Sequence, residues 1–243
     1  MELQDKIALV TGGGSGIGLG VAKALAAEGC RVVVTGRSQG RLDEAVAGWN
    51  EPPAPVARAC DVSDREQVNA LFAGLADELG PVEILVNNAG INVPKRMMAD
   101  LDPAEFDQIL AINTTGTFNC TYAALPAMRE RGEGLIVNIV SIAGKRAMKL
   151  GGVGYCAAKF AQAALGTTVG LEERAHGIRV TNIYPGEVET PILDRRPVPV
   201  PPEKRAQMLK PADIAACVVL VAKLPPRVLV PELVITPLYQ EFA

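Results

Sequence analysis

A tyrosine and a lysine four positions apart, Tyr155 and Lys159, form the pair in this sequence best suited to proton transfer. An α-helix repeats about every 3.6 residues, so on a helix the phenol and the ammonium would share one face, one turn apart. A free tyrosine titrates near pH ~10, but a nearby cation favours the phenolate and lowers the pKa of the phenol. The spacing therefore predicts a tyrosine that exchanges protons near neutral pH. An exposed pair without a function is the alternative.

A second chemical feature is the glycine-rich segment of residues 12–18, GGGSGIG, which lies between a short apolar run and a helical stretch. Backbone amides and a helix N-terminus at such a turn can receive a pyrophosphate, because no side chain intervenes. The glycines at positions 12, 16 and 18 are spaced more widely than in G-x-G-x-x-G, so the segment is a variant of the dinucleotide fingerprint. The alternative is a glycine-rich turn that binds nothing.

The elements that must position these residues alternate along the chain. Apolar runs predict strands at residues 6–11, 31–35, 56–60, 84–86, 135–141 and 178–183, and helices are expected at 39–49, 63–78, 103–131 and 153–175. Ser63 with Glu66 forms a predicted capping box, and Asp102 with Pro103 marks the start of the long helix. Parallel strands joined by helices predict a doubly wound α/β sheet, whose ligands bind beyond the carboxyl ends of the strands.

The last part of the chain interrupts this alternation. Residues 185–202 are rich in proline, which excludes regular helix and central strand, so residues 185–210 are expected to form a loop or lid over the substrate. Residues 203–209 and 212–224 are expected to be helical, and residues 227–235 to form a closing strand. A single α/β domain of this length buries a sizeable core, and we expect residues 1–243 to form a single domain.

The composition excludes several classes of function. The 243 residues are 49% hydrophobic and 21% charged with a formal net charge of -3, which provides no basic surface for nucleic acid. The N-terminus lacks the pattern of a signal peptide, and the apolar run at residues 214–222 is too short to span a membrane. We therefore expect a cytoplasmic protein without a membrane partner.

The cysteines point to the same compartment. The chain has five, an odd number without C-x-x-C spacing, so neither a disulfide framework nor a metal site is expected. Cys156, next to Tyr155, is interpreted as a packing residue. The single histidine, His176, lies beyond the end of the helix at 153–175 and is interpreted as part of its C-terminal cap. A reducing environment fits this usage best.

The motifs together resemble those of the short-chain dehydrogenase/reductase family. The resemblance rests on the glycine turn, on the Asn-Asn-Ala-Gly of residues 87–90, on Asn113, on Ser141 and on Tyr155 with Lys159, and it covers nearly the whole chain. It implies a single Rossmann-type domain with about seven strands and helices on both faces, assembled through two long helices into a homodimer or homotetramer. The end of the chain, residues 231–237, lacks the Asp-Gly-Gly type of ending seen in many members.

The resemblance also implies roles for the catalytic candidates. Tyr155 would be the general acid in carbonyl reduction and the base in alcohol oxidation. Lys159 would lower the pKa of this tyrosine and bind the nicotinamide ribose, and Ser141 would donate a hydrogen bond to the substrate oxygen. Asn113 would hold a water in a proton relay, and the alternative is a polar residue satisfied locally.

The residues assigned to the cofactor are numerous: Gly12, Ser15, Gly16, Ile17, Gly18, Arg37, Asp61, Val62, Asn88, Ala89, Gly90, Tyr155, Lys159, Pro185, Gly186, Val188 and Thr190. Asn87 would join Gly90 along the ribose. Asp61 would meet the adenine edge, or would instead be a turn residue that leads into a helix. The second strand ends at Gly36 without a carboxylate and is followed by Arg37, so we expect NADP(H) in preference to NAD(H).

The function predicted is an oxidoreductase that transfers a hydride between a nicotinamide cofactor and a small secondary alcohol or ketone. One alternative is a non-catalytic regulator of the same fold that senses the nucleotide. Another is sugar-nucleotide epimerisation, which is disfavoured because little chain follows Gly186. Lys145, Arg146 and Lys149 could meet an acidic substrate group, although a solvated basic turn is the preferred interpretation.

Overall fold

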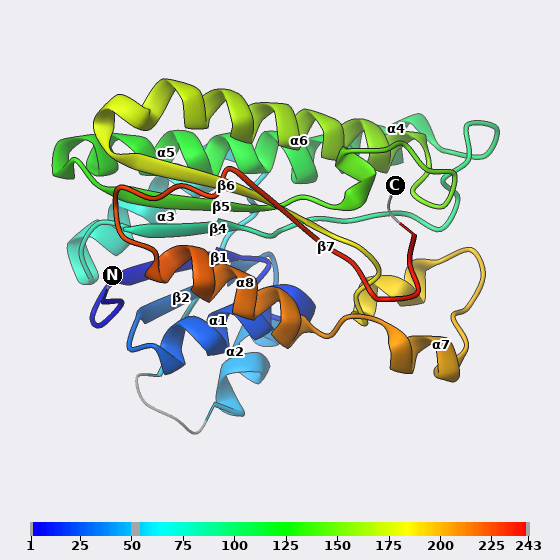
Figure 1. Ribbon diagram of the computed structural model, residues 1–243, viewed down its shortest axis with the longest axis horizontal. Coiled ribbons are helices and arrows are strands. Elements are labelled where there is room, and N and C mark those ends of the chain that lie inside the picture. The colour runs from blue at the N-terminus through cyan, green and yellow to red at the C-terminus, as the bar shows by residue number, and fades with distance from the viewer. Residues whose placement is uncertain (1, 50–53, 242–243) are drawn as a thin grey trace.

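The computed structural model describes residues 2–49 and 54–241 (Figure 1). Seven strands form one sheet in the order β3-β2-β1-β4-β5-β6-β7, and every neighbouring pair is parallel. The strands are β1 (Ile7–Thr11), β2 (Arg31–Gly36), β3 (Val56–Ala59), β4 (Ile84–Asn87), β5 (Gly134–Ile139), β6 (Ile178–Pro185) and β7 (Glu232–Ile235). The predicted doubly wound α/β sheet of seven strands is confirmed.

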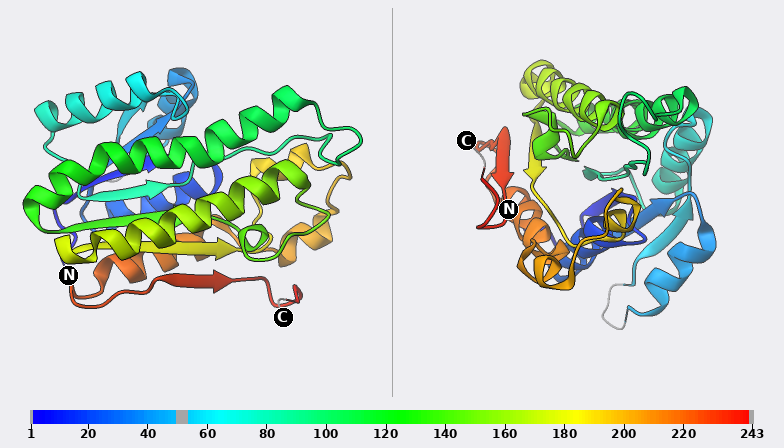
Figure 2. Two further views of the ribbon diagram at one scale, coloured as in Figure 1. Left: turned by 90° about the horizontal axis from the view of Figure 1, so that it is seen from above. Right: turned by 90° about the vertical axis from the view of Figure 1, so that its right-hand side faces the viewer.

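Helices cover both faces of this sheet (Figure 2). One face carries α1 (Gly16–Ala27), α2 (Gln39–Ala47) and α8 (Pro211–Lys223), and the other carries α3 (Arg65–Glu78), α4 (Pro103–Leu110), α5 (Gly116–Arg131) and α6 (Val153–Glu172). Successive side chains of a strand point to opposite faces, so Ala8 and Val10 of β1 pack in the core under α1 while Leu9 packs in the core under α5. This burial on both faces explains the continuous apolar runs in the sequence.

The long helix expected at residues 103–131 is interrupted. A π-helical turn, Ala111–Thr115, lies between α4 and α5 and contains Asn113. The Asn113 side chain both accepts from the backbone N–H of Ile91 and donates to the Ile91 carbonyl, at 2.8 and 3.0 Å. These bonds tie the wider turn to the loop after β4, a contact that helical periodicity does not reveal.

The capping box predicted at Ser63 is wrong by one residue. Asp64 caps α3, because its Oδ1 accepts from the backbone N–H groups of Glu66 and Gln67. The Ser63 hydroxyl instead donates to Asp61 Oδ1 at 2.6 Å. Because the Ser63 hydroxyl is bonded to Asp61, the side chain of the next residue, Asp64, caps the helix instead.

Three other boundaries differ from the expectation. Strand β5 ends at Ile139, so Ser141 lies in the turn beyond the strand. The closing strand is limited to Glu232–Ile235, because Pro225, Pro226 and Pro231 have no backbone N–H to donate to a neighbouring strand. The proline-rich stretch contains a 3-10 turn, Pro191–Arg195, followed by α7 (Pro202–Gln207). Within residues 2–49 and 54–241, no helix is long and apolar enough to cross a membrane.

Candidate active site

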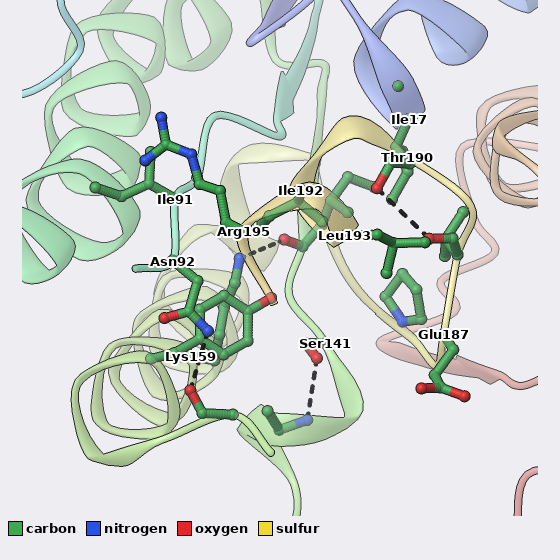
Figure 3. A pocket seen from close by; sticks show the side chains of 18 of the residues that line it. Ile17, Ile91, Asn92, Ser141, Lys159, Glu187, Thr190, Ile192, Leu193 and Arg195 are labelled. Carbon is green, nitrogen blue, oxygen red and sulfur yellow. Dashed lines mark hydrogen bonds between the residues drawn. The ribbon is translucent and has the colours of Figure 1, made fainter. Parts of the chain in front are cut away.

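A cavity of about 410 Å³ opens beyond the carboxyl ends of β1, β4, β5 and β6 (Figure 3). Its wall is formed by the glycine turn, by residues 88–92 after β4, by the Ser141 turn after β5, by the start of α6 and by residues 185–196 after β6. These segments follow four strands of the parallel sheet, and both the Ser141 turn and the start of α6 come after β5. The cavity therefore lies where the topology of an open α/β sheet places a ligand.

The glycine turn has a tightly packed backbone. A Cβ at Gly18 would overlap with the Gly12 carbonyl oxygen and would lie 2.5 Å from Asn88 Nδ2, so only glycine fits there. Asn88 Nδ2 donates to the carbonyls of Thr11 and Gly12, and Thr11 Oγ1 accepts from the backbone N–H groups of Asn88 and Ala89. These bonds hold the turn against the loop after β4.

This turn is suited to a pyrophosphate. Ser15 precedes α1, and within the described part of the chain its side chain makes no capping bond to the helix. The N–H groups of the first helical turn therefore face the cavity beside Gly16 and Ile17 without competition from a side chain, and they carry the positive end of the helix dipole. The donors present fit the diphosphate of a dinucleotide.

Most residues assigned to the cofactor line this one cavity. They are Gly12, Ser15, Gly16, Ile17, Asn88, Ala89, Gly90, Tyr155, Lys159, Pro185, Gly186, Val188 and Thr190. The other four lie outside its wall. Gly18 packs against the turn, Val62 packs against Gly116, and Arg37 is exposed beyond the end of β2.

Asp61 has a local role in the structure. Its Oδ1 accepts from the backbone N–H and the hydroxyl of Ser63, which is the turn that leads into α3. These contacts fit the alternative interpretation, in which Asp61 is a turn residue that leads into a helix. A contact of Asp61 with adenine remains a prediction.

Asn87 does not line the cavity, which corrects the expectation that it follows the ribose. It is buried and donates to Asn138 Oδ1 at 3.0 Å, and Asn138 in turn donates to Asn182 Oδ1 at 2.9 Å. The three asparagines occupy paired positions on β4, β5 and β6. A Cβ at Gly166 of α6 would lie 2.4 Å from Asn138 Nδ2, so this row of amides also determines how closely α6 approaches the sheet.

Tyr155 lies in the first turns of α6 and faces the cavity together with Ser141. Burial raises the pKa of the Tyr155 phenol above its usual value, whereas a hydrogen bond with the Ser141 hydroxyl and the charge of Arg96 act to lower it. Burial has the largest effect on this pKa, and the lowering effect expected of Lys159 remains a prediction. Lys159 Nζ lies 5.7 Å from the centre of the tyrosine ring.

Lys159 is almost completely buried, with 3% of its surface exposed. Its Nζ donates to the Ile139 carbonyl at 2.9 Å and to Gln162 Oε1 at 2.7 Å. Burial lowers the pKa of Lys159 to about 7, because the ammonium loses its hydration. The two acceptors leave one of the three ammonium N–H groups for a ligand in the cavity.

Behind Lys159, hydrogen bonds continue into the core. Gln162 Nε2 donates to Thr117 Oγ1 at 3.0 Å, and this hydroxyl donates to the Asn113 carbonyl, also at 3.0 Å. Gln162, Thr117 and Asn113 are buried, so Lys159 is connected to the π-helical turn by a continuous polar path. Asn113 is satisfied locally through its side chain, and a water held by Asn113 remains a prediction. Sequence patterns did not identify Gln162 or Thr117.

The basic residues that follow Ser141 do not form part of the cavity wall. Lys145 forms an ion pair with Glu232 and lies 4.5 Å from the centre of the Tyr184 ring. Arg146 and Lys149 are exposed and do not line the cavity. The sequence analysis missed three arginines in the cavity wall: Arg96, from the loop after β4, and Arg195 and Arg196, from the segment after β6.

The remaining candidates have structural roles. His176 belongs to a 3-10 turn, Glu173–His176, that ends at Gly177 with φ 72°, so it forms part of the end of α6 as expected. Cys156 is buried with Sγ near the Met148 carbonyl, and all five cysteines are free. Across the described ranges, no group of three or more metal-ligating side chains is close enough to hold an ion.

The comparisons with known proteins agree with this site. Residues 6–198 match the family model of short chain dehydrogenase. Levodione reductase from Leifsonia aquatica is 35% identical over 202 residues, covering 82% of this chain and 75% of that protein.

Solved structures extend the likeness to the whole chain. An alcohol dehydrogenase from the archaeon Thermococcus sibiricus, complexed with 5-hydroxy-NADP, superimposes with a TM-score of 0.87 and 30% identity and covers 99% of this chain and 100% of its own. A 3-ketoacyl-(acyl-carrier-protein) reductase from Brucella melitensis, complexed with NADH, gives a TM-score of 0.84 at 29% identity. The match covers 97% of this chain and 98% of that protein. The non-catalytic regulator is not favoured by these relatives. The chain belongs to the short chain dehydrogenase family and is an NAD(P)-dependent oxidoreductase acting on alcohol and carbonyl groups.

Proposed function

We propose that Tyr155 is the acid and base of this oxidoreductase and that Ser141 and Lys159 assist it. The supporting observation is that the Tyr155 phenol and the Ser141 hydroxyl share one cavity wall with the buried Lys159. The nicotinamide, when bound, supplies or accepts the hydride. In the direction of reduction, Tyr155 gives its proton to the carbonyl oxygen of the substrate, and Ser141 donates a hydrogen bond to the same oxygen as negative charge develops.

Lys159 balances the charge of this proton transfer. Its pKa of about 7 keeps a substantial fraction of the ammonium charged near neutral pH. When the phenol loses its proton, the ammonium, which lies 5.7 Å from the centre of the tyrosine ring, stabilises the phenolate in a site of low polarity. The third N–H of Lys159 is directed to the cofactor ribose. Water associated with Asn113 can return the proton to Tyr155.

The test is the substitution Tyr155→Phe, which removes the hydroxyl and keeps the ring. We expect turnover of ketones to fall by ~10²–10⁴-fold, because a general acid typically contributes that much. The dissociation constant of the reduced cofactor, measured by its fluorescence, should not change. Tyr122→Phe, on the exposed side of α5, is the matched control and should keep full activity. Wild-type turnover in Tyr155→Phe would exclude Tyr155 from the mechanism.

We further propose that the cofactor is NADP(H), with NAD(H) as the weaker ligand. Strand β2 ends at Gly36, Arg37 and Arg41 are exposed there, and no described carboxylate forms an ion pair with Arg37. A guanidinium can donate two parallel hydrogen bonds to the 2′-phosphate. Asp61 and Val62 would then approach the adenine, and Gly18 would shape the phosphate turn.

A charge-assisted bond between Arg37 and the phosphate should favour NADPH over NADH by about 10- to 150-fold. The measurement compares dissociation constants and kcat/KM for both cofactors in wild type and in Arg37→Ala. Arg31→Ala is the control, because Arg31 lies on the same strand at its opposite end. If wild type prefers NADH, or if Arg37→Ala leaves the ratio unchanged, the assignment is wrong.

The substrate is a small alcohol or carbonyl compound that enters between Ser141, Tyr155 and the segment of residues 185–210. This segment serves as the lid. The free cysteines suit a reducing compartment, and we propose a cytoplasmic location. We also propose a homodimer or homotetramer formed through α5 and α6, which expose Phe118, Tyr122, Phe160 and Leu171.

A further inference from the structure

Arg96 is a buried cation in the wall of the cavity, with 6% of its surface exposed. Three hydrogen bonds fix its guanidinium to backbone carbonyls: Nε to Val93 at 2.8 Å, Nη1 to Leu150 at 3.1 Å and Nη2 to Arg195 at 2.6 Å. A guanidinium has five N–H groups, so these bonds leave part of its donor capacity unused. They also come from three separate loops, which makes the side chain rigid.

The positive charge of Arg96 is not compensated by the protein. No carboxylate in residues 2–49 or 54–241 forms an ion pair with it. Of the nearby groups, the cation Arg196 lowers the pKa of Arg96 and Tyr155 raises it. Burial has the largest effect on this pKa and lowers it, as expected for an ion taken from water without a counterion. By contrast, the buried Glu173 is paired with Arg129 and the buried Glu187 with Arg196.

The position of Arg96 brings this charge close to the reacting groups. A Cβ at Gly152 would overlap with the Arg96 carbonyl oxygen and would lie 2.6 Å from Arg96 Cβ, so the arginine packs directly against the start of α6. Gly152 immediately precedes this helix, and Tyr155 lies in its first turn. The charge of Arg96 also acts on the Tyr155 phenol. An anion bound by Arg96 would therefore lie only a few bonds from the carbon that reacts.

The same end of the cavity is rich in cations although the whole chain has a net charge of -3. Arg195 and Arg196 also line it, and Figure 3 shows Arg195 beside Ile91 and Ile192. Among the described lining residues, Glu187 is the only carboxylate, and Arg196 and Lys204 pair with it. Among the described residues, Arg96, Arg195 and Lys159 line the cavity without a carboxylate partner, and of the two arginines Arg96 is the buried one.

On the basis of the proposed function, we infer that the substrate is a compact oxo acid or hydroxy acid whose carboxylate is bound by the Arg96 guanidinium. A carboxylate accepts two parallel N–H bonds from a guanidinium, which fixes both the position and the orientation of a small ligand. The remaining wall near this point is largely apolar, with Ile91, Leu150 and Ile192, and suits a short hydrocarbon chain. Arg96 then selects for acids over neutral ketones.

The experiment measures reduction of pyruvate, acetoacetate and levulinate, and of the methyl ester of each, with both reduced cofactors. In wild type we expect at least one acid to have a higher kcat/KM than its ester. Arg96→Met should lower the kcat/KM of that acid by about 10- to 150-fold, mainly through KM, and should lower the kcat/KM of the ester much less. Arg96→Lys should restore part of the preference, because it keeps the charge and loses the fork geometry. Lys149→Met removes one positive charge from the exposed surface and should not change kcat/KM for the acid or for the ester.

The outcomes separate this inference from the proposed function. The inference is wrong if wild type reduces the ester at least as well as the acid in every pair. It is also wrong if Arg96→Met lowers kcat/KM equally for acid and ester, because Arg96 then only holds the loops together. If neither acids nor esters are reduced with either cofactor, the proposed function itself fails. Thermal unfolding and cofactor binding of each variant show whether it is folded. If Arg96→Met does not fold, Arg96→Gln serves for the same comparison, since its amide can still donate to a carbonyl.

Discussion

At the scale of single residues, Lys159 depends on neighbours that no motif contains. Its ammonium is buried, and the structure compensates with acceptors from Ile139 and Gln162. Thr117 holds the amide of Gln162 in place and is itself bonded to Asn113. Burial lowers the pKa of Lys159 to about 7. If Lys159 has the proposed role, Gln162 acts on the reaction through Lys159 and is a positioning residue.

The substitution Gln162→Leu tests this dependence. Gln162 Oε1 accepts from the charged form of Lys159, so its loss lowers the pKa of Lys159 further. The ammonium then persists only to a lower pH, and the alkaline limb of the kcat/KM profile should shift to lower pH. Gln162→Glu should shift the same limb to higher pH, because a carboxylate favours the ammonium. Gln108→Leu on the exposed side of α4 is the control. A profile that changes in height without moving would contradict this role.

At the scale of elements, the contact between β1 and α1 depends on one glycine. Gly18 lies in the first turn of α1 and touches the Gly12 carbonyl, and the same turn is held by the Asn88 side chain. The Gly18 backbone has no positive φ, so alanine is excluded there by space and not by conformation. A glycine at position 18 is therefore required for α1 to pack this closely against the turn that follows β1.

We expect Gly18→Ala to weaken cofactor binding strongly and to lower thermal stability, because α1 must move away from the turn. Gly74→Ala is the matched control. Gly74 is also helical, but a Cβ there would meet nothing within 4 Å. Alanine at that position should stabilise α3 by roughly 0.5–1 kcal/mol. Calorimetric unfolding and fluorescence titration of the reduced cofactor measure both effects. Normal cofactor affinity in Gly18→Ala would contradict the role of this contact.

At the scale of the whole molecule, α5 and α6 lie side by side on one face of the sheet (Figure 1). This face exposes large apolar side chains, with Tyr122 at 63% and Leu171 at 59% exposure, where a monomer would normally present polar residues. Burying them against a second copy gains hydrophobic free energy without a change in the fold.

The double variant Tyr122→Glu, Leu171→Glu should therefore reduce the molar mass in sedimentation or light scattering from that of an oligomer to that of a smaller species. Charges at these positions would have to be buried in the interface, which is costly. The control is Leu220→Glu, an equally exposed leucine on α8 across the sheet, which should leave the assembly through α5 and α6 intact. A wild-type monomer, or an oligomer unaffected by the double variant, would contradict this interface.

Local patterns in the sequence were sufficient to predict the fold and to recognise the pair formed by Tyr155 and Lys159. Buried parallel strands appear as apolar runs because both faces are covered, and the alternation with helices then predicts the doubly wound sheet. The glycine turn and the spacing of Tyr155 and Lys159 were also recognisable, because a turn or a single helix determines both over a few residues. The cap of α3 was missed by one residue, because Asp61 competes for Ser63.

Only the tertiary structure decided which groups surround Tyr155. Arg96 is held by carbonyls up to 99 positions away, and Gln162 and Thr117 are 45 positions apart. The asparagines of β4, β5 and β6 pair across strands, which withdrew Asn87 from the cofactor. Such contacts leave no periodicity in the sequence, because they depend on how loops and strands distant in the chain approach one another. The free energies of burial and hydrogen bonding at these sites are properties of the assembled site and not of any one segment.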